Sequence, residues 1–140
     1  MSFELDSILV DVDHIGIAVA DLEAATQEYG RAFGVEPVHR ERVEDQGVDE
    51  VLFQVGTSYI QLLGATALDT PVGKFLERHG EGVHHVGYRV RDVGAVLARL
   101  KEAGLPVVDE APRPGSRGAI VAFVHPKAFR GVLVELVQEP

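Results

Sequence analysis

The chain has 140 residues, a length that fits one ordinary domain or two very small ones that share a core. Its 22 acidic and 13 basic residues give a net charge of −9, which argues against a protein that binds nucleic acid or an anionic membrane surface. The chain contains no cysteine, which excludes disulfides, thiolate catalysis and cysteine-ligated metal centres. Any metal ion must therefore bind to histidine, carboxylate or amide side chains.

The beginning of the sequence bears on location. Residues 1–13 are acidic and include no basic residue, whereas a secretory signal needs a basic start followed by an apolar run. The apolar runs of the chain are far shorter than the roughly 20 residues that a membrane span requires. We therefore expect a cytoplasmic protein.

The charge is distributed unevenly along the chain. Residues 1–50 hold 13 acidic side chains and three basic ones, whereas residues 111–134 contain no acid and have a net charge of +4. A basic segment in an acidic chain indicates a local site for an anion such as phosphate, with chance clustering on a solvated face as the alternative.

Two segments of the chain repeat one another at an offset of 71 residues. DHIGIAVADL at 13–22 matches HHVGYRVRDV at 84–93, and a helical pattern that stops at a glycine, Gly34 or Gly104, follows each segment. The repeat predicts two modules of similar fold.

Each module is expected to fold as βαβββ, which makes the fold class α+β. In the first module, about residues 10–63, we expect strands near 15–19, 35–38, 51–55 and 58–63 and a helix over 21–33, followed by a short helix over 70–79. In the second, about residues 82–138, we expect strands near 86–90, 106–109, 119–124 and 132–137 and a helix over 92–103. The two tandem modules are expected to form a single domain over residues 1–140.

Two histidines, His14 and His85, occupy equivalent places at the start of the repeated strands. A glycine follows each by two residues on the same strand face, Gly16 or Gly87, and clears space beside the imidazole. A lone histidine at a strand end is more often a satisfied or exposed side chain, but the equivalence of these two favours a shared site.

Two further polar side chains lie within aliphatic strands. Glu135 stands in VLVELV, where burial of a carboxylate is costly unless it is paired or binds a metal; an edge strand with Glu135 facing water is the alternative. Gln61 stands in YIQLL, where a hydrogen-bonded core amide is the alternative. The repeat relates Gln61 to Glu135 as it relates His14 to His85. Two imidazoles, one carboxylate and one amide oxygen suit Co²⁺, Ni²⁺, Mn²⁺ or Zn²⁺.

The paired modules and this quartet resemble the vicinal oxygen chelate superfamily, which includes the glyoxalases, and within it the methylmalonyl-CoA epimerase family. The matching segments extend over most of the chain: DHIGIAV (13–19), QGVDE (46–50), YIQLL (59–63), GVHHV (82–86), HPK (125–127) and GVLVEL (131–136). The resemblance implies a curved mixed sheet around a divalent metal ion, Co²⁺ above all, with His14, Gln61, His85 and Glu135 as its ligands. It also implies a homodimer.

The resemblance further implies a reaction, the interconversion of (2R)- and (2S)-methylmalonyl-CoA by proton abstraction at C2 through a metal-stabilised enolate. Glu50 would then be a catalytic base, with one more surface acid in an acidic stretch as the alternative. Glu135 or a metal-bound water would be the second acid or base. The phosphates of coenzyme A would give the basic segment a function, with Arg113, Ser116, Arg117 and Lys127 as the binding residues.

Other functions of the same fold remain as alternatives. A glyoxalase I-like lactoylglutathione lyase usually has an acid where Gln61 stands, and an Fe²⁺ dioxygenase would use two histidines and one glutamate. A non-catalytic small-molecule-binding protein of this fold lacks the four ligands. The sequence assigns no role to His39, His79, His84 and His125.

Overall fold

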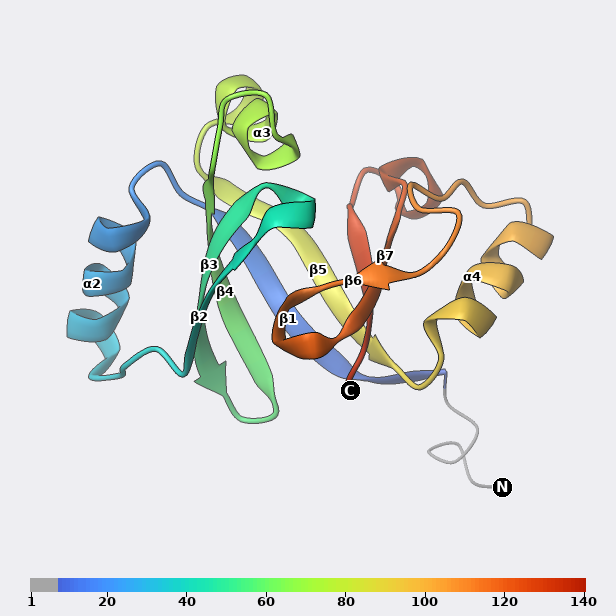
Figure 1. Cartoon of the computed structure of the whole chain (residues 1–140), viewed down its shortest axis with the longest axis horizontal. Coiled ribbons are helices and arrows are strands. Elements are labelled where there is room, and N and C mark those ends of the chain that lie inside the picture. Colours follow the sequence, from blue (N-terminus) through green and yellow to red (C-terminus); the bar gives the residue numbers. More distant parts are fainter. Residues whose placement is uncertain (1–7) are drawn as a thin grey trace. The chain divides into compact units, whose positions relative to one another are not determined.

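The structure, a computed structural model, describes residues 8–140 of the chain (Figure 1). These residues form two compact units. We call the unit of residues 14–84 the central unit, and the unit that combines residues 8–13 with residues 85–140 the terminal unit. The boundaries fall inside two strands, β1 (Leu9–Ala18) and β5 (Gly82–Val90).

The central unit contains a four-stranded sheet and two helices. Besides its parts of β1 and β5, it consists of α2 (Leu22–Phe33), β2 (His39–Val43), β3 (Val48–Val55), β4 (Ser58–Ala65) and α3 (Pro71–His79), with a 3₁₀ turn at Glu44–Gln46. The strand order is β2-β3-β4-β1, in which β1 runs parallel to β4 and the other pairs are antiparallel.

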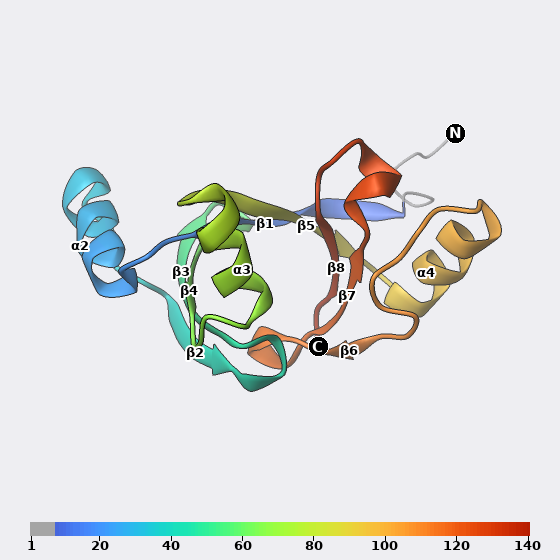
Figure 2. The same cartoon turned by 90° about the horizontal axis from the view of Figure 1, so that it is seen from above.

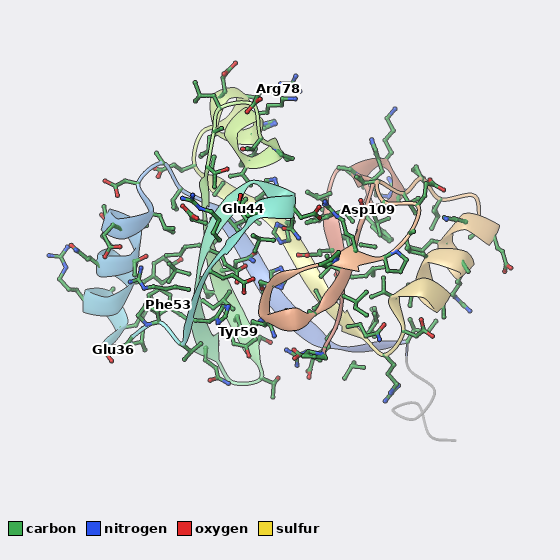
Figure 3. All side chains as sticks on the ribbon, viewed as in Figure 1. Glu36, Glu44, Phe53, Tyr59, Arg78 and Asp109 are labelled. Carbon is green, nitrogen blue, oxygen red and sulfur yellow. The ribbon has the colours of Figure 1, made fainter. Side chains whose placement is uncertain are left out.

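Side chains alternate between the two faces of this sheet, and each face packs against a different helix. The face toward α2 buries Val19, Ala25, Val51, Phe53 and Leu62. Phe53, labelled in Figure 3, points toward α2, where its ring stacks on Tyr29 with centroids 5.6 Å apart. The opposite face packs against α3 through Ala18, Val43, Val48, Leu63 and Val72. This second face also carries the polar residues that the sequence singles out.

The terminal unit repeats this order of elements. It contains the first part of β1, most of β5, α4 (Val93–Glu102), β6 (Arg113–Pro114), β7 (Ile120–Val124) and β8 (Val134–Gln138), with 3₁₀ turns at Ser116–Gly118 and Pro126–Phe129. Its strands follow the order β5-β8-β7-β6, with β5 parallel to β8 and the other pairs antiparallel. Helix α4 covers one face of this sheet (Figure 2) and buries Val93, Val96 and Leu97 against β7 and β8.

Local signals in the sequence determine where the helices begin and end. The side chains of Asp21, Thr70 and Asp92 each accept a hydrogen bond from the backbone N–H three residues later, at 3.0, 3.1 and 3.0 Å. Gly34 ends α2 in the left-handed conformation with φ of 65°, and Gly104, with φ of 76°, follows the end of α4. The helices predicted from these signals are therefore confirmed.

Two predicted strands differ from the structure. The strand expected over 35–38 lies at β2 instead, because Pro37 lacks the N–H that a ladder needs, and the first backbone bond to β3 comes from Val38. The strand expected over 106–109 is wrong, since Val107 forms only an isolated bridge with Val124. Asp109 accepts a hydrogen bond from the backbone N–H of Phe123 at 2.7 Å, so a side chain replaces part of the ladder.

The βαβββ order of both modules agrees with the prediction, whereas the assignment of residues 1–140 to a single domain stays a prediction. Within residues 8–140, none of the helices has both the length and the apolar character that crossing a membrane requires. Part of the acidic N-terminal segment, residues 1–7, lies outside the described residues.

A fully buried carboxylate, Asp13, anchors β1 in the terminal unit. Arg89 approaches its Oδ1 with Nη2 at 2.8 Å and Nε at 3.0 Å, and Arg117 approaches its Oδ2 with Nη2 at 3.0 Å. Arg117 also contacts the half-exposed Glu139 at 3.1 Å. Because a buried charge is costly unless it is paired, these contacts hold β1, β5 and the turn before β7 together.

Replacing Asp13 by alanine is expected to lower the free energy of unfolding by about 3–5 kcal/mol, because the two arginines lose the buried charge that they neutralise. The matched control is Asp49→Ala, which breaks an exposed pair with Arg42 and should cost less than about 1 kcal/mol. Urea denaturation of both variants measures the difference. Equal losses would contradict a structural role for the buried network.

Candidate active site

Three of the predicted site residues share the α3-facing side of the central unit. The register of β1 and β4 sets Gly16 against Gln61, so Gln61 lies on the same face as His14. Glu50 lies two residues from the position of β3 that pairs with Gln61, and therefore on the same face. All three residues are buried, with exposed fractions of 4% for His14, 2% for Glu50 and 7% for Gln61. The alternative of Glu50 as a surface acid is thus wrong.

A hydrogen bond joins the two residues of β3 and β4. The amide Nε2 of Gln61 donates to Oε1 of Glu50 at 2.7 Å, which fixes both the carboxylate and the orientation of the amide. The amide oxygen of Gln61 is buried, and among residues 8–140 it has no hydrogen-bond partner. Because an unsatisfied buried acceptor is costly, this oxygen fits a ligand atom for a divalent ion.

The terminal unit brings together the other two predicted ligands. Nε2 of His85 lies 3.0 Å from Oε1 of Glu135, and the two residues are 3% and 4% exposed. The ring of Phe123 meets the imidazole edge to face, with centroids 5.5 Å apart. β8 is an interior strand between β5 and β7, so the alternative of Glu135 on an edge strand facing water is wrong.

The two units present these side chains in equivalent ways. Gly16 stands opposite Gln61 in the parallel pair β1 and β4, and Gly87 stands opposite Glu135 in the parallel pair β5 and β8. In both cases, a residue without a side chain leaves room beside the side chain of Gln61 or Glu135. The strand register therefore agrees with the equivalence of Gln61 and Glu135 that the sequence repeat predicts. That all four residues bind one ion stays a prediction.

Two residues to which the sequence assigns no role, His39 and Glu41, lie next to Glu50. The side chain of His39 contacts Glu41 at 2.8 Å and approaches Oε2 of Glu50 to 4.0 Å. The signal in the sequence is the spacing H-x-E in β2, because alternate residues of a strand share a face. The spacing alone does not show that Glu50 is the neighbour of His39 and Glu41, because that follows only from the pairing of β2 with β3.

The basic segment divides into paired and exposed side chains. Arg117 neutralises Asp13, and Arg113 lies 3.4 Å from Asp109 with its guanidinium 5.6 Å from the ring centroid of Phe123. The side chain of Lys127 is exposed, and Ser116 is half-buried in its 3₁₀ turn. Binding of coenzyme A phosphates by these residues stays a prediction.

A separate ion pair lies on the α2-facing side of the central unit. Arg42 donates two hydrogen bonds to Asp49, at 2.6 and 2.9 Å, and these bonds hold the pKa of Asp49 below its usual value. Because side chains alternate, this pair faces away from Glu50. The polar face around Glu50 is therefore distinct from the charged outer face.

Comparison with known proteins agrees with this geometry. The pattern of the Glyoxalase/Bleomycin resistance protein/Dioxygenase superfamily matches residues 13–123. The ethylmalonyl-CoA/methylmalonyl-CoA epimerase of Cereibacter sphaeroides is 40% identical over 129 residues, which cover 91% of this chain and 96% of that protein.

Two solved structures are also similar, each with a TM-score of 0.91 and 42% sequence identity. One is a variant of the Streptomyces coelicolor methylmalonyl-CoA epimerase in complex with 2-nitronate-propionyl-CoA, covering 94% of this chain and 95% of that one. The other is a methylmalonyl-CoA epimerase in complex with methylmalonyl-CoA and NH4+, covering 95% and 96%. The predicted α+β fold of tandem βαβββ modules is confirmed by these matches.

The contact between Gln61 and Glu50 yields a prediction on stability. Gln61→Leu is expected to lower the free energy of unfolding by about 2 kcal/mol, because the buried carboxylate loses a hydrogen-bond donor. The control is Gln54→Leu, an exposed amide on β3 whose loss should change stability by less than about 0.5 kcal/mol. Thermal and urea unfolding of the two variants provide the measurement. A stability of Gln61→Leu equal to that of the control would contradict the contact.

Proposed function

The chain belongs to the Glyoxalase/Bleomycin resistance protein/Dioxygenase superfamily, and we propose that it is a methylmalonyl-CoA epimerase that interconverts the (2R) and (2S) epimers. The observation that carries this proposal is the buried contact between Gln61 and Glu50. A glyoxalase I-like lyase usually has an acid in place of Gln61, whereas an amide suits a site that holds a separate carboxylate base. The identity of 40% to an epimerase that acts on ethylmalonyl-CoA and methylmalonyl-CoA supports the same assignment.

Glu50 is the proposed catalytic base. The C2 proton of methylmalonyl-CoA lies between a thioester carbonyl and a carboxylate, so its removal places negative charge on the thioester oxygen. Gln61 orients the Glu50 carboxylate through Oε1, and burial separates it from bulk water. A buried and oriented carboxylate is the kind of group that contributes about 10²–10⁴-fold by general base catalysis.

We propose that His14, Gln61, His85 and Glu135 bind one divalent ion, with Co²⁺ preferred to Ni²⁺, Mn²⁺ or Zn²⁺. The support is the buried, unpartnered amide oxygen of Gln61 within the described residues, together with the contact between His85 and Glu135. When bound, such an ion stabilises the negative charge that develops on the substrate oxygens. One carboxylate and three neutral ligands leave that ion with net positive charge.

Inversion at C2 also needs an acid on the face opposite the base, and we propose Glu135 for this role. Its carboxylate is buried and lies against His85, whose ring fixes its position. The proposal gives Glu135 two functions, as ligand and as acid, and the two carboxylates exchange the roles of acid and base when the other epimer is the substrate.

For coenzyme A, we propose that Lys127 contributes the exposed charge that attracts the phosphates, together with Ser116, Arg113 and Arg117. Both arginines already pair with carboxylates of the terminal unit, which compensate their charge. Their proposed contribution to phosphate binding is therefore mainly through hydrogen bonds. A cytoplasmic location and a homodimeric assembly complete the proposal, as the sequence and the family imply.

The protein loaded with Co²⁺ is expected to exchange the C2 hydrogen of methylmalonyl-CoA with deuterium from the solvent and to interconvert the epimers. Glu50→Gln should retain metal but exchange at least about 10²-fold more slowly, because an amide cannot accept the proton. Glu28→Gln, the same substitution at an exposed position of α2, is the matched control. Mass spectrometry and proton NMR follow the exchange.

Exchange by Glu50→Gln at the rate of the unmodified protein would remove Glu50 from its proposed role. Absence of exchange in the metal-loaded protein, with turnover of a glutathione hemithioacetal, would replace the epimerase by a lyase.

Metal binding provides an independent prediction. His14→Ala and His85→Ala are each expected to lose bound metal, whereas His84→Ala, a half-exposed neighbour of His85 that packs on Phe75, should keep it. Calorimetric titration with Co²⁺ and elemental analysis measure the content. Full metal content in the double variant of His14 and His85 would overturn the ligand assignment.

A further inference from the structure

A carboxylate that takes a proton from substrate while buried must pass that proton on before the next turnover. The side chain of Glu50 is only 1% exposed, so it has almost no direct contact with water. Its Oε1 accepts the hydrogen bond from Gln61, and its Oε2 lies 4.0 Å from Nε2 of His39, so Oε2 is the oxygen that passes a proton on in this scheme. A route from Oε2 to the solvent is therefore required.

The register of β2 and β3 places two titratable residues next to Glu50 on the same face of the sheet. Glu41 pairs directly with Glu50 in the antiparallel ladder, and His39 lies two residues away on the same face. Nε2 of His39 is 2.8 Å from Oε1 of Glu41 and 4.0 Å from Oε2 of Glu50. One imidazole nitrogen thus lies between two carboxylates.

His39 and Glu41 are partly exposed to solvent, whereas the neighbouring Glu50 is buried. The side chains of His39 and Glu41 are 32% and 33% exposed, against 1% for Glu50. The other charged side chains of β2, Arg40 and Arg42, pair with Glu23 and Asp49 on the α2-facing side. His39 and Glu41 consequently connect a buried carboxylate to the surface on the site-facing side of the sheet.

We propose that His39, together with Glu41, is a proton relay that exchanges the proton of Glu50 with solvent. The inference rests on the proposed function, because it requires Glu50 to act as base. His39 does not contact the reacting carbon in this scheme and is a positioning residue that acts through Glu50. Imidazole suits the task because a ring nitrogen can donate a proton to one carboxylate and then accept a proton from another.

The transfer is balanced without a further reactant. The ring of His39 begins the cycle as an imidazolium with protons on Nδ1 and Nε2, and Nδ1 keeps its proton throughout. Glu41 takes the proton from Nε2, which leaves a neutral imidazole, and releases that proton to water. Nε2 then accepts the proton from Oε2 of Glu50, so Glu50 becomes a carboxylate again and His39 an imidazolium. One N–H bond breaks and one forms at Nε2, the O–H bond of Glu50 breaks, and one proton reaches the solvent. A rotation of the imidazole brings Nε2 from Glu41 to Glu50.

The test uses each pure epimer of methylmalonyl-CoA in D₂O with the metal-loaded protein. Deuterium in the recovered starting epimer is compared with the amount of product formed. In His39→Ala, a proton held by Glu50 returns to C2 before it exchanges, so this ratio should fall about tenfold for the epimer that Glu50 deprotonates. For the other epimer, the opposite group removes the proton and the ratio should not change.

Three further measurements sharpen the result. His79→Ala, which removes an exposed histidine of α3, is the matched control and should leave both ratios unchanged. Glu41→Gln keeps the shape of the pair but cannot carry a proton, and it should show the same asymmetry as His39→Ala. Added imidazole should restore the exchange ratio of His39→Ala.

An unchanged ratio for both epimers in His39→Ala and Glu41→Gln overturns the relay. An equal fall for both epimers also overturns it, because a merely structural role impairs the two directions alike. Absence of exchange and of epimerisation in the unmodified protein overturns the proposed function instead, so the two failures are distinguishable.

Discussion

Buried polar side chains need partners within the sheet that carries them, and this requirement determines which polar residues lie side by side within each unit. In the central unit, Gln61 satisfies Glu50 through its nitrogen and presents its oxygen elsewhere. In the terminal unit, Glu135 meets His85. Glycines stand opposite both Gln61 and Glu135, because a side chain at either position would lie beside these buried polar side chains on the same face of the sheet.

The amide of Gln61 links two functions that an acid at the same position could not combine. An amide has both a donor and an acceptor, so it orients the Glu50 carboxylate and still presents an oxygen to the proposed metal ion. An ionised carboxylate would repel Glu50 at this distance and would add negative charge to the proposed ligand set. The choice between amide and acid at this single position therefore bears on whether Glu50 can act as the proposed base.

Local patterns in the sequence predict much of the fold. The caps at Asp21, Thr70 and Asp92 mark the helices correctly because capping depends on neighbouring residues. The repeat predicts the equivalence of Gln61 and Glu135 because both follow from strand alternation. The expected strand at 106–109 is wrong because Asp109 and the backbone of Phe123 satisfy each other, a contact between residues far apart in sequence. For the same reason, the sequence does not reveal Arg117 as the partner of Asp13, or His39 as the neighbour of Glu50.

The compact units and the repeated segments divide the chain at different points. The repeat suggests a cut between residues 63 and 82, whereas the terminal unit includes residues 8–13 at the other end of the sequence. Asp13, which pairs with both Arg89 and Arg117, belongs to that distant segment. A single module therefore does not carry all the charges that its own arginines require. A chain that contained the second module alone would lack the buried counter-ion of Arg89 and Arg117. The terminal unit therefore requires that both modules belong to one chain.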